Sequence, residues 1–182
     1  MDQPKEESVI VLDFLPNGYP FENKPVHLKT PVAQSVGKAH FTLLEIAVPR
    51  GVHLVPYEEV ELSNKEKVQR VSGRLPMSKL SATAKAELNF VINEIIEKNE
   101  KRFVDFFNKA QPVSMRTHQL ELLPGLGKKH MWEIIDAREQ GVFTSFDDLR
   151  KRVHLMPDPK KIIARRIVAE LEDKEKHKLF VL

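Results

Sequence analysis

The spacing of hydrophobic residues changes once along this chain, near residue 76, and this change limits the possible folds more than any other feature. Before it, residues 8–75 hold short apolar runs that are separated by Pro and Gly. After it, Leu80, Ala84, Leu88 and later apolar residues recur at the spacing of one helix face. The sequence therefore predicts an α+β chain, with the strands first and the helices after them.

The first part, residues 1–76, is predicted to form a small β-barrel. The runs with strand character lie at residues 8–15, 24–29, 40–48, 57–62 and 68–75. A sheet of such short strands needs closure or a cover to hide its edges. We expect an OB-like β-barrel of five strands, and an SH3-like barrel is the alternative.

The second part is predicted to be helical. Residues 77–110 are the expected connecting helices: a long amphipathic helix capped by Ser81, then a short helix rich in Phe. Residues 111–182 are expected to form an all-α domain of helices joined by short turns. In it, Gly141 is typical of a helix end and Ser145 of a helix start.

The charge of the chain is unevenly distributed. Residues 1–80 carry ten basic and ten acidic side chains, and residues 81–110 carry five of each. Residues 111–182 carry fourteen basic and eleven acidic side chains, so the net charge of +3 lies there. Such a surplus fits a polyanionic partner, but it is also typical of a solvated helical surface.

The composition excludes several classes of protein and of site. Cys is absent, which excludes disulfides and thiolate metal sites and suits a cytoplasmic location. We expect no membrane segment, since no apolar run approaches the roughly 20 residues that a spanning helix needs, and the polar N-terminus lacks signal-peptide character. The seven His residues show no metal-ligand spacing, and no P-loop, nucleophile elbow or carboxylate pair is present. We therefore expect no catalytic residues, no metal, no cofactor and no enzyme activity.

The strongest functional signal is a turn between two helical segments, at residues 122–129. Pro124 is expected to end the first helix. Gly125 and Gly127 are expected to adopt the positive φ of a tight turn and to leave no Cβ in front of the backbone. Leu126 is expected to fill the gap between the helices.

The start of the following helix is the expected binding site. There, the amides of Gly127, Lys128 and Lys129 would face outward, and the two lysines add positive charge. Free amides at a helix N-terminus bind anions, so a phosphodiester fits this combination. The alternative is a tight turn with a structural role only.

An internal repeat supports this interpretation. A shift of 33 residues aligns Leu122-Leu123-Pro124-Gly125 with Leu155-Met156-Pro157-Asp158. In the second copy, Asp158 and Lys160 replace Gly125 and Gly127, so we expect that hairpin to be mainly structural. Flanking phosphate contacts, or alternatively solvated faces, are expected at Lys160, Lys161, Arg165 and Arg166 and at Arg150, Lys151 and Arg152.

Residues 114–173 resemble a tandem helix-hairpin-helix domain, as found in Holliday-junction-binding RuvA, the C-type excinuclease, bacterial ligases and competence DNA receptors. The run at residues 141–149 is similar to the link between the two hairpins of that family, whereas Met131 stands where the family has a small residue. Nearly the whole chain also resembles an uncharacterised archaeal family in which an OB-like barrel precedes such a tandem. The resemblance implies contact with the sugar–phosphate backbone, without base readout.

We therefore expect a protein that binds DNA or RNA without sequence specificity. A second contact on the barrel would require its aromatic residues, Tyr19, Phe21, Phe41 and Tyr57, but the barrel has no net charge. The alternative is a protein–protein interaction scaffold that uses the helical surface around Met131 and Trp132.

Overall fold

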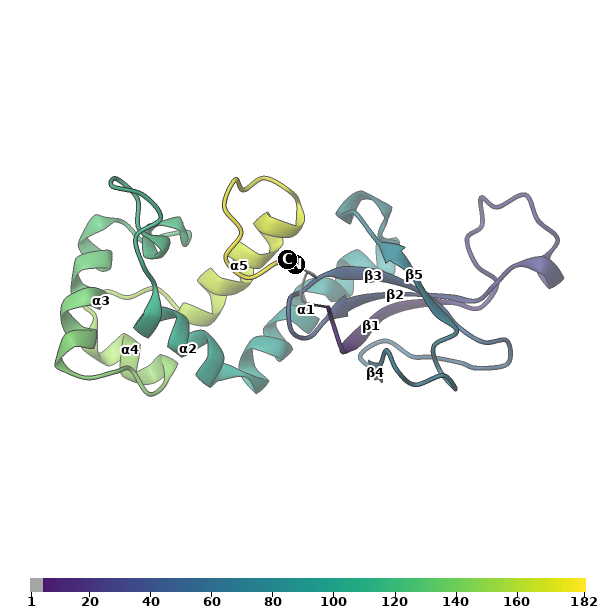
Figure 1. Cartoon of the computed structure of the whole chain (residues 1–182), viewed down its shortest axis with the longest axis horizontal. Coiled ribbons are helices and arrows are strands. Elements are labelled where there is room, and N and C mark those ends of the chain that lie inside the picture. The colour runs from purple at the N-terminus through teal and green to yellow at the C-terminus, as the bar shows by residue number, and fades with distance from the viewer. Residues whose placement is uncertain (1–4) are drawn as a thin grey trace. The chain divides into compact units, whose positions relative to one another are not determined.

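The computed structural model describes residues 5–182, which divide into two compact units (Figure 1). The first unit comprises the residues up to Val91 together with Glu170–Leu182, and the second comprises Ile92–Ala169. Helices α1 (Ala82–Lys98) and α5 (Pro159–Leu171) each contribute residues to both units.

The first unit is built on one antiparallel sheet with the strand order β4-β1-β2-β3-β5. The strands are β1 (Ser8–Leu15), β2 (Val32–Gly37), β3 (Leu43–Ala47), β4 (Glu59–Glu61) and β5 (Arg70–Arg74). The apolar core of this unit contains Val9, Val11, Ala33, Leu44, Ile46, Val48, Leu54, Val60 and Val68.

The sheet is open, so the expected closed OB-like or SH3-like barrel is wrong. Strands β4 and β5 lie at its two edges and do not pair with each other within the described residues. Strand β4 has only three residues, and every residue of β5, including Arg70 and Arg74, is exposed. A short edge and a charged edge protect an open sheet against pairing with another chain, so closure is not required.

The central strand β2 was not among the expected strands, because Gln34 and Ser35 interrupt its apolar run. Both side chains are fully buried, and both form hydrogen bonds. The Ser35 hydroxyl donates to the Leu44 carbonyl at 2.9 Å, and Gln34 Nε2 donates to the Lys79 carbonyl at 3.0 Å. Buried polar groups with such partners are compatible with a central strand.

The strand expected at residues 24–29 is also wrong. A short, exposed 3-10 helix, η1 (Val26–Leu28), lies there instead. The expected strand β1 is confirmed, and the runs at 40–48, 57–62 and 68–75 contain the shorter strands β3, β4 and β5.

Helix α1 follows the 3-10 helix η2 (Met77–Lys79) and is tied to the sheet at its first residues. The Ala84 amide donates to Ser81 Oγ at 3.0 Å, which confirms Ser81 as the helix cap. Ser81 Oγ also donates to Asp13 Oδ2 at 2.6 Å, and the Ser81 amide donates to Gln34 Oε1 at 2.8 Å. The polar residues of β1 and β2 therefore determine where α1 begins.

The last residues of the chain pack in the first unit. The carboxylate of Glu170 is fully buried and accepts hydrogen bonds from the amides of Leu179, Phe180 and Val181 at 2.8–3.0 Å. Phe180 and Val181 are buried as a result.

The second unit is helical. Its elements are the end of α1, then α2 (Glu100–Lys109), η3 (Gln119–Leu122), α3 (Lys128–Gln140), α4 (Phe146–Arg152) and most of α5. Its buried side chains include Phe103, Phe107, Leu120, Leu123, Ile134, Leu149, Ile163 and Ile167. The segment before the turn at Pro124 is a single turn of 3-10 helix, which is shorter than expected.

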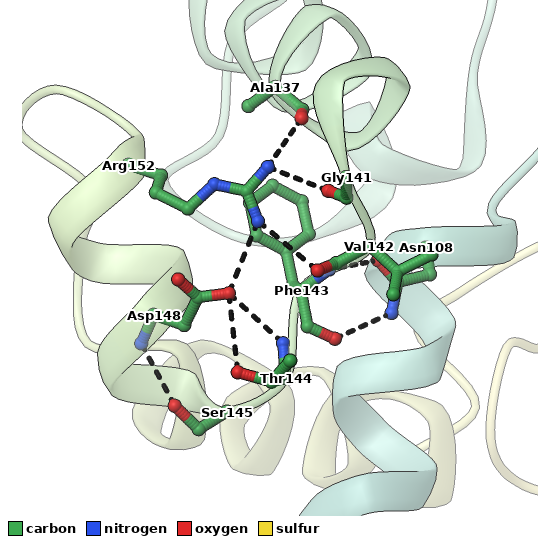
Figure 2. A network of polar contacts seen from close by, with 9 residues as sticks. All are labelled: Asn108, Ala137, Gly141, Val142, Phe143, Thr144, Ser145, Asp148 and Arg152. Carbon is green, nitrogen blue, oxygen red and sulfur yellow. Dashed lines mark hydrogen bonds and ion pairs between the residues drawn. The ribbon is translucent and has the colours of Figure 1, made fainter.

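The guanidinium of Arg152 holds together the end of α3 and the start of α4 (Figure 2). Its Nη2 donates to the carbonyls of Ala137 and Gly141 at 2.5 and 2.6 Å. Its Nη1 donates to the Val142 carbonyl and to Asp148 Oδ2, both at 3.2 Å. The carbonyls at the end of a helix have no partners within the helix, and this side chain supplies donors to them.

The link between α3 and α4 is held by further contacts of the same network. The Arg152 guanidinium lies 4.5 Å from the centroid of the Phe143 ring, which is buried. The Phe143 amide donates to Asn108 Oδ1 at 2.8 Å, which connects this link to α2. The Asp148 amide donates to Ser145 Oγ at 2.9 Å, which confirms the predicted start of α4.

We predict that Arg152→Ala lowers the free energy of unfolding by on the order of 2–3 kcal/mol, because several carbonyls lose a charged donor. Lys151→Ala, at the exposed neighbouring position, is the matched control and should change it by less than about 0.5 kcal/mol. Chemical denaturation of both variants measures this difference. Equal stabilities would contradict the role assigned to Arg152.

Candidate nucleic-acid interface

The turn before α3 has the geometry of a type II β-turn. The Leu126 amide donates to the Leu123 carbonyl at 3.2 Å, and Gly125 has φ +83°. Pro124 precedes that glycine, as is common in a turn of this type. Leu123 and Leu126 are both buried, so the turn is anchored at its two ends.

Gly127 differs from what we expected. Its φ of −100° and ψ of −173° are extended values that any residue adopts, so the predicted positive φ is wrong at this position. A Cβ placed on Gly127 would have no other atom within 4 Å. Gly127 is the N-cap of α3, and it offers no side chain to the amides that follow.

The amides at the start of α3 are left without partners in the chain. The first helical hydrogen bond is donated by the Met131 amide to the Gly127 carbonyl at 3.0 Å. Within residues 5–182, the amides of Gly127, Lys128, Lys129 and His130 have no hydrogen-bond acceptor. Four such N–H groups at the positive end of a helix form a site for an anion.

Lys128 and Lys129 add two positive charges at the same place. Both side chains are exposed, and neither has an acidic partner in the part of the chain that the structure describes. His130 is the next residue, and its Nε2 lies 3.2 Å from the Leu155 carbonyl. The first turn of α3 thus presents its two lysines to solvent while its third side chain holds the loop after α4.

The second turn, before α5, is closed by its own residues. Pro159 is the first residue of α5 and has no amide hydrogen. The Lys160 amide donates to Asp158 Oδ1 at 3.0 Å, and the Lys160 ammonium pairs with Glu97. These contacts support the expectation that the second hairpin is mainly structural.

The other predicted cations fall into two groups. Lys161, Arg165, Arg150 and Lys151 are exposed on α4 and α5. Arg166 is buried, and its Nη1 donates to the Leu122 carbonyl at 2.8 Å, while Arg152 is used by the network described above. The structure therefore brings Gly125–Lys129 together in one turn and leaves Lys161 and Arg165 as flanking surface charges.

A groove of about 540 Å³ lies beside this turn and was not expected from the sequence. It lies between α3 and a tight hairpin at residues 112–118, in which the Val113 amide donates to the Thr117 carbonyl at 2.8 Å. Trp132, which we expected to be partly buried, lines the groove and is 58% exposed.

His118 lines the same groove and starts the 3-10 helix η3. Its Nδ1 accepts the Leu120 amide at 3.1 Å, and its own amide donates to Glu121 Oε2 at 2.9 Å. This is a capping box with His in place of Ser or Thr, which explains why the sequence pattern did not reveal it. Burial lowers the pKa of His118, the nearby charge of Arg138 lowers it further, and Glu121 partly opposes both effects.

The aromatic residues of the first unit are only partly available for a second contact. The rings of Tyr19 and Phe21 stack with centroids 5.1 Å apart beside a hollow of about 580 Å³, and Phe21 is exposed. Burial and the hydrogen bond to Glu45 raise the pKa of Tyr19 to about 12. Phe41 is fully buried, so it cannot stack on a base, and Tyr57 is partly exposed.

Two searches of residues 5–182 gave negative results. None of the described helices is both long and apolar enough to cross a membrane. The same residues contain no group of three His, Asp or Glu side chains that could hold a metal ion.

Comparison with known proteins places the chain among archaeal relatives. Residues 5–182 match the family model described as "Protein of unknown function (DUF655)". The chain is 40% identical to an uncharacterized protein of Methanocaldococcus jannaschii, over 98% of this chain and 81% of that protein. It is also similar to the crystal structure of Af1531 from Archaeoglobus fulgidus, with a TM-score of 0.87 and 42% identity over 97% of this chain and 100% of that one.

We predict that the protein loses stability as the pH falls below about 6.5, the ordinary pKa of His. Because the pKa of His118 is lower in the folded state, the unfolded state binds the proton more readily, and protonation also removes the acceptor for the Leu120 amide. Denaturation at pH 8 and pH 5.5 should show this loss. His118→Asn keeps a capping acceptor without the titration, so it should lose less stability over the same range; an equal loss would contradict the assignment to His118.

Proposed function

This chain belongs to the DUF655 family of uncharacterised archaeal proteins, and we propose that it binds nucleic acid through the turn before α3. In this proposal the amides of Gly127, Lys128 and Lys129 hold one phosphate of the backbone, and the two lysines hold that phosphate and its neighbour. The elements η3-turn-α3 and α4-turn-α5 are then the two members of a helix-hairpin-helix tandem.

The observation that carries the proposal is the contrast between the two turns. Both precede a helix of thirteen residues. At α5, proline removes one amide and Asp158 occupies the next, whereas at α3 the corresponding amides have no acceptor within the described residues. Unsatisfied helix amides are costly unless water or a ligand reaches them, and exposed lysines beside them favour an anionic ligand.

This mode of binding has consequences for specificity. Amides and lysines that contact phosphate position a protein on a strand but do not read bases. A contact with about two to four phosphates gives a salt slope of roughly −2 to −4 for a duplex. We therefore propose binding that depends on salt and not on sequence, to DNA or RNA, and without any chemical change to the strand.

The first test separates the amide from the lysine at position 128. Lys128 is the first residue of α3, and the extended backbone of Gly127 is compatible with a following proline. Lys128→Ala removes only the charge and should reduce the salt slope by about one. Lys128→Pro also removes the amide, as in α5, and should weaken binding further by about tenfold to a hundredfold, since a hydrogen bond to an anion is lost.

These variants are compared by titration of a labelled duplex, a single strand and a folded RNA at two salt concentrations. The double variant Arg150→Ala/Lys151→Ala removes two exposed charges of α4 and controls for a general loss of charge. Equal affinities of Lys128→Pro and Lys128→Ala would show that the amide does not bind phosphate.

The second test fills the empty N-cap of α3. The space in front of Gly127 is open, so Gly127→Asp and Gly127→Asn can be accommodated, and each can cap the amides of Lys129 and His130. We predict that both variants gain a few tenths of a kcal/mol in the free energy of unfolding and that both lose affinity for nucleic acid. Denaturation and titration together measure the two opposite changes.

Asn and Asp differ in charge alone, so their comparison separates occupation of the amides from repulsion of phosphate. If Gly127→Asn binds nucleic acid as tightly as the unchanged protein, the amides are not the binding groups. The alternative function, a protein–protein interaction scaffold, is favoured if none of these probes binds and a defined protein co-purifies through the Trp132 surface.

A further inference from the structure

The groove beside the turn shares a residue with the proposed phosphate site. Lys128 begins α3 and also lines the groove. Trp132 lies one helical turn further along, on the same side of α3, with its side chain more than half exposed. Met115, at the tip of the hairpin at residues 112–118, is fully exposed and lines the groove from the other side. A flat aromatic ring and a flexible thioether therefore lie within one groove, next to the lysine of the phosphate site.

The groove also contains a built hydrogen-bond donor. His118 is only 7% exposed, and its Nδ1 is used as the acceptor for the Leu120 amide. In the neutral ring the proton therefore lies on Nε2, which has no partner among the described residues. No buried side-chain nitrogen in the described residues lacks a partner, so this Nε2 reaches solvent, and the groove is the hollow that His118 lines.

The remaining charges of the groove have defined roles. Arg138 donates to the carbonyls of Phe107 and Ala110 at 3.1 and 3.0 Å, and Glu121 is held by the His118 amide. Arg116 and Lys128 are exposed, and neither has an ion pair within the described residues. The available chemistry is therefore an aromatic face, an apolar edge, one neutral N–H donor and two cations.

We propose that this groove binds one unpaired nucleobase of the strand whose phosphate occupies the turn. Trp132 stacks on the base, Met115 contacts it from the opposite side, and His118 Nε2 donates to an acceptor on its edge. Unpaired bases are recognised by aromatic stacking and by hydrogen bonds to their exposed edges, which a duplex conceals. This inference rests on the proposed phosphate site, and it adds a preference for single strands, overhangs or loops over a blunt duplex.

The test uses Trp132 as its own reporter, because it is the single Trp of the chain. Two probes are compared: a short single-stranded thymidine oligonucleotide and an oligonucleotide of the same length in which every position is abasic. We expect the thymidine strand to quench Trp132 fluorescence and to bind about five- to a hundredfold more tightly. The abasic strand should bind through the turn without quenching.

Two variants locate the effect in the groove. Trp132→Ala changes an exposed side chain, and His118→Asn removes the Nε2 donor while it retains a capping group for the Leu120 amide. Both should reduce the affinity for the thymidine strand towards that for the abasic strand, and neither should change the affinity for the abasic strand. Circular dichroism of both variants verifies that the helices are intact.

Each other outcome overturns the inference in a recognisable way. Equal binding of the two probes with no quenching would reject the base site and leave the phosphate site standing. Binding of neither probe would reject both. A Trp132 signal that depends on protein concentration without any oligonucleotide would show that a second copy of the chain occupies the groove.

Discussion

The arginine at the end of α4 is the interaction on which the geometry of the second unit depends. Arg152 supplies hydrogen bonds to the carbonyls at the end of α3 and a cation over the Phe143 ring. Because those carbonyls cannot be satisfied within the helix, the position of α3 relative to α4 is determined by one planar guanidinium. The opposite end of α3, with its free amides, therefore belongs to an element that is held rigidly.

The start of α3 has the opposite character, because its backbone groups are left without partners. An Asp, Asn or Ser at position 127 would cap the helix, as Asp158 does at α5, but the chain has Gly there. The type II turn at Pro124 and Gly125 brings the chain into α3 without covering its amides. A helix start with no cap, next to one with a complete cap, is the structural basis of the proposed phosphate contact.

The proposed base site would convert a weak and general contact into one that depends on strand structure. A single phosphate turn gives limited affinity, and the open sheet contributes only Tyr19 and Phe21 as an aromatic surface. The groove beside α3 lies within the same compact unit as the turn, so both contacts act on one strand without movement between units. Stacking on Trp132 adds binding energy without any need for a specific base.

The sequence by itself determined the order of strands and helices, the caps at Ser81 and Ser145, and the turn around Gly125, because local periodicity and turn chemistry encode these features. Only the tertiary structure decided that the sheet is open, that β2 contains buried Gln34 and Ser35, and that His118 lines a groove. These features depend on partners distant in sequence, such as the Leu44 and Lys79 carbonyls, which no local pattern specifies. For the same reason the sequence indicated the glycine at position 127, whereas its extended backbone and the open space in front of it required the structure.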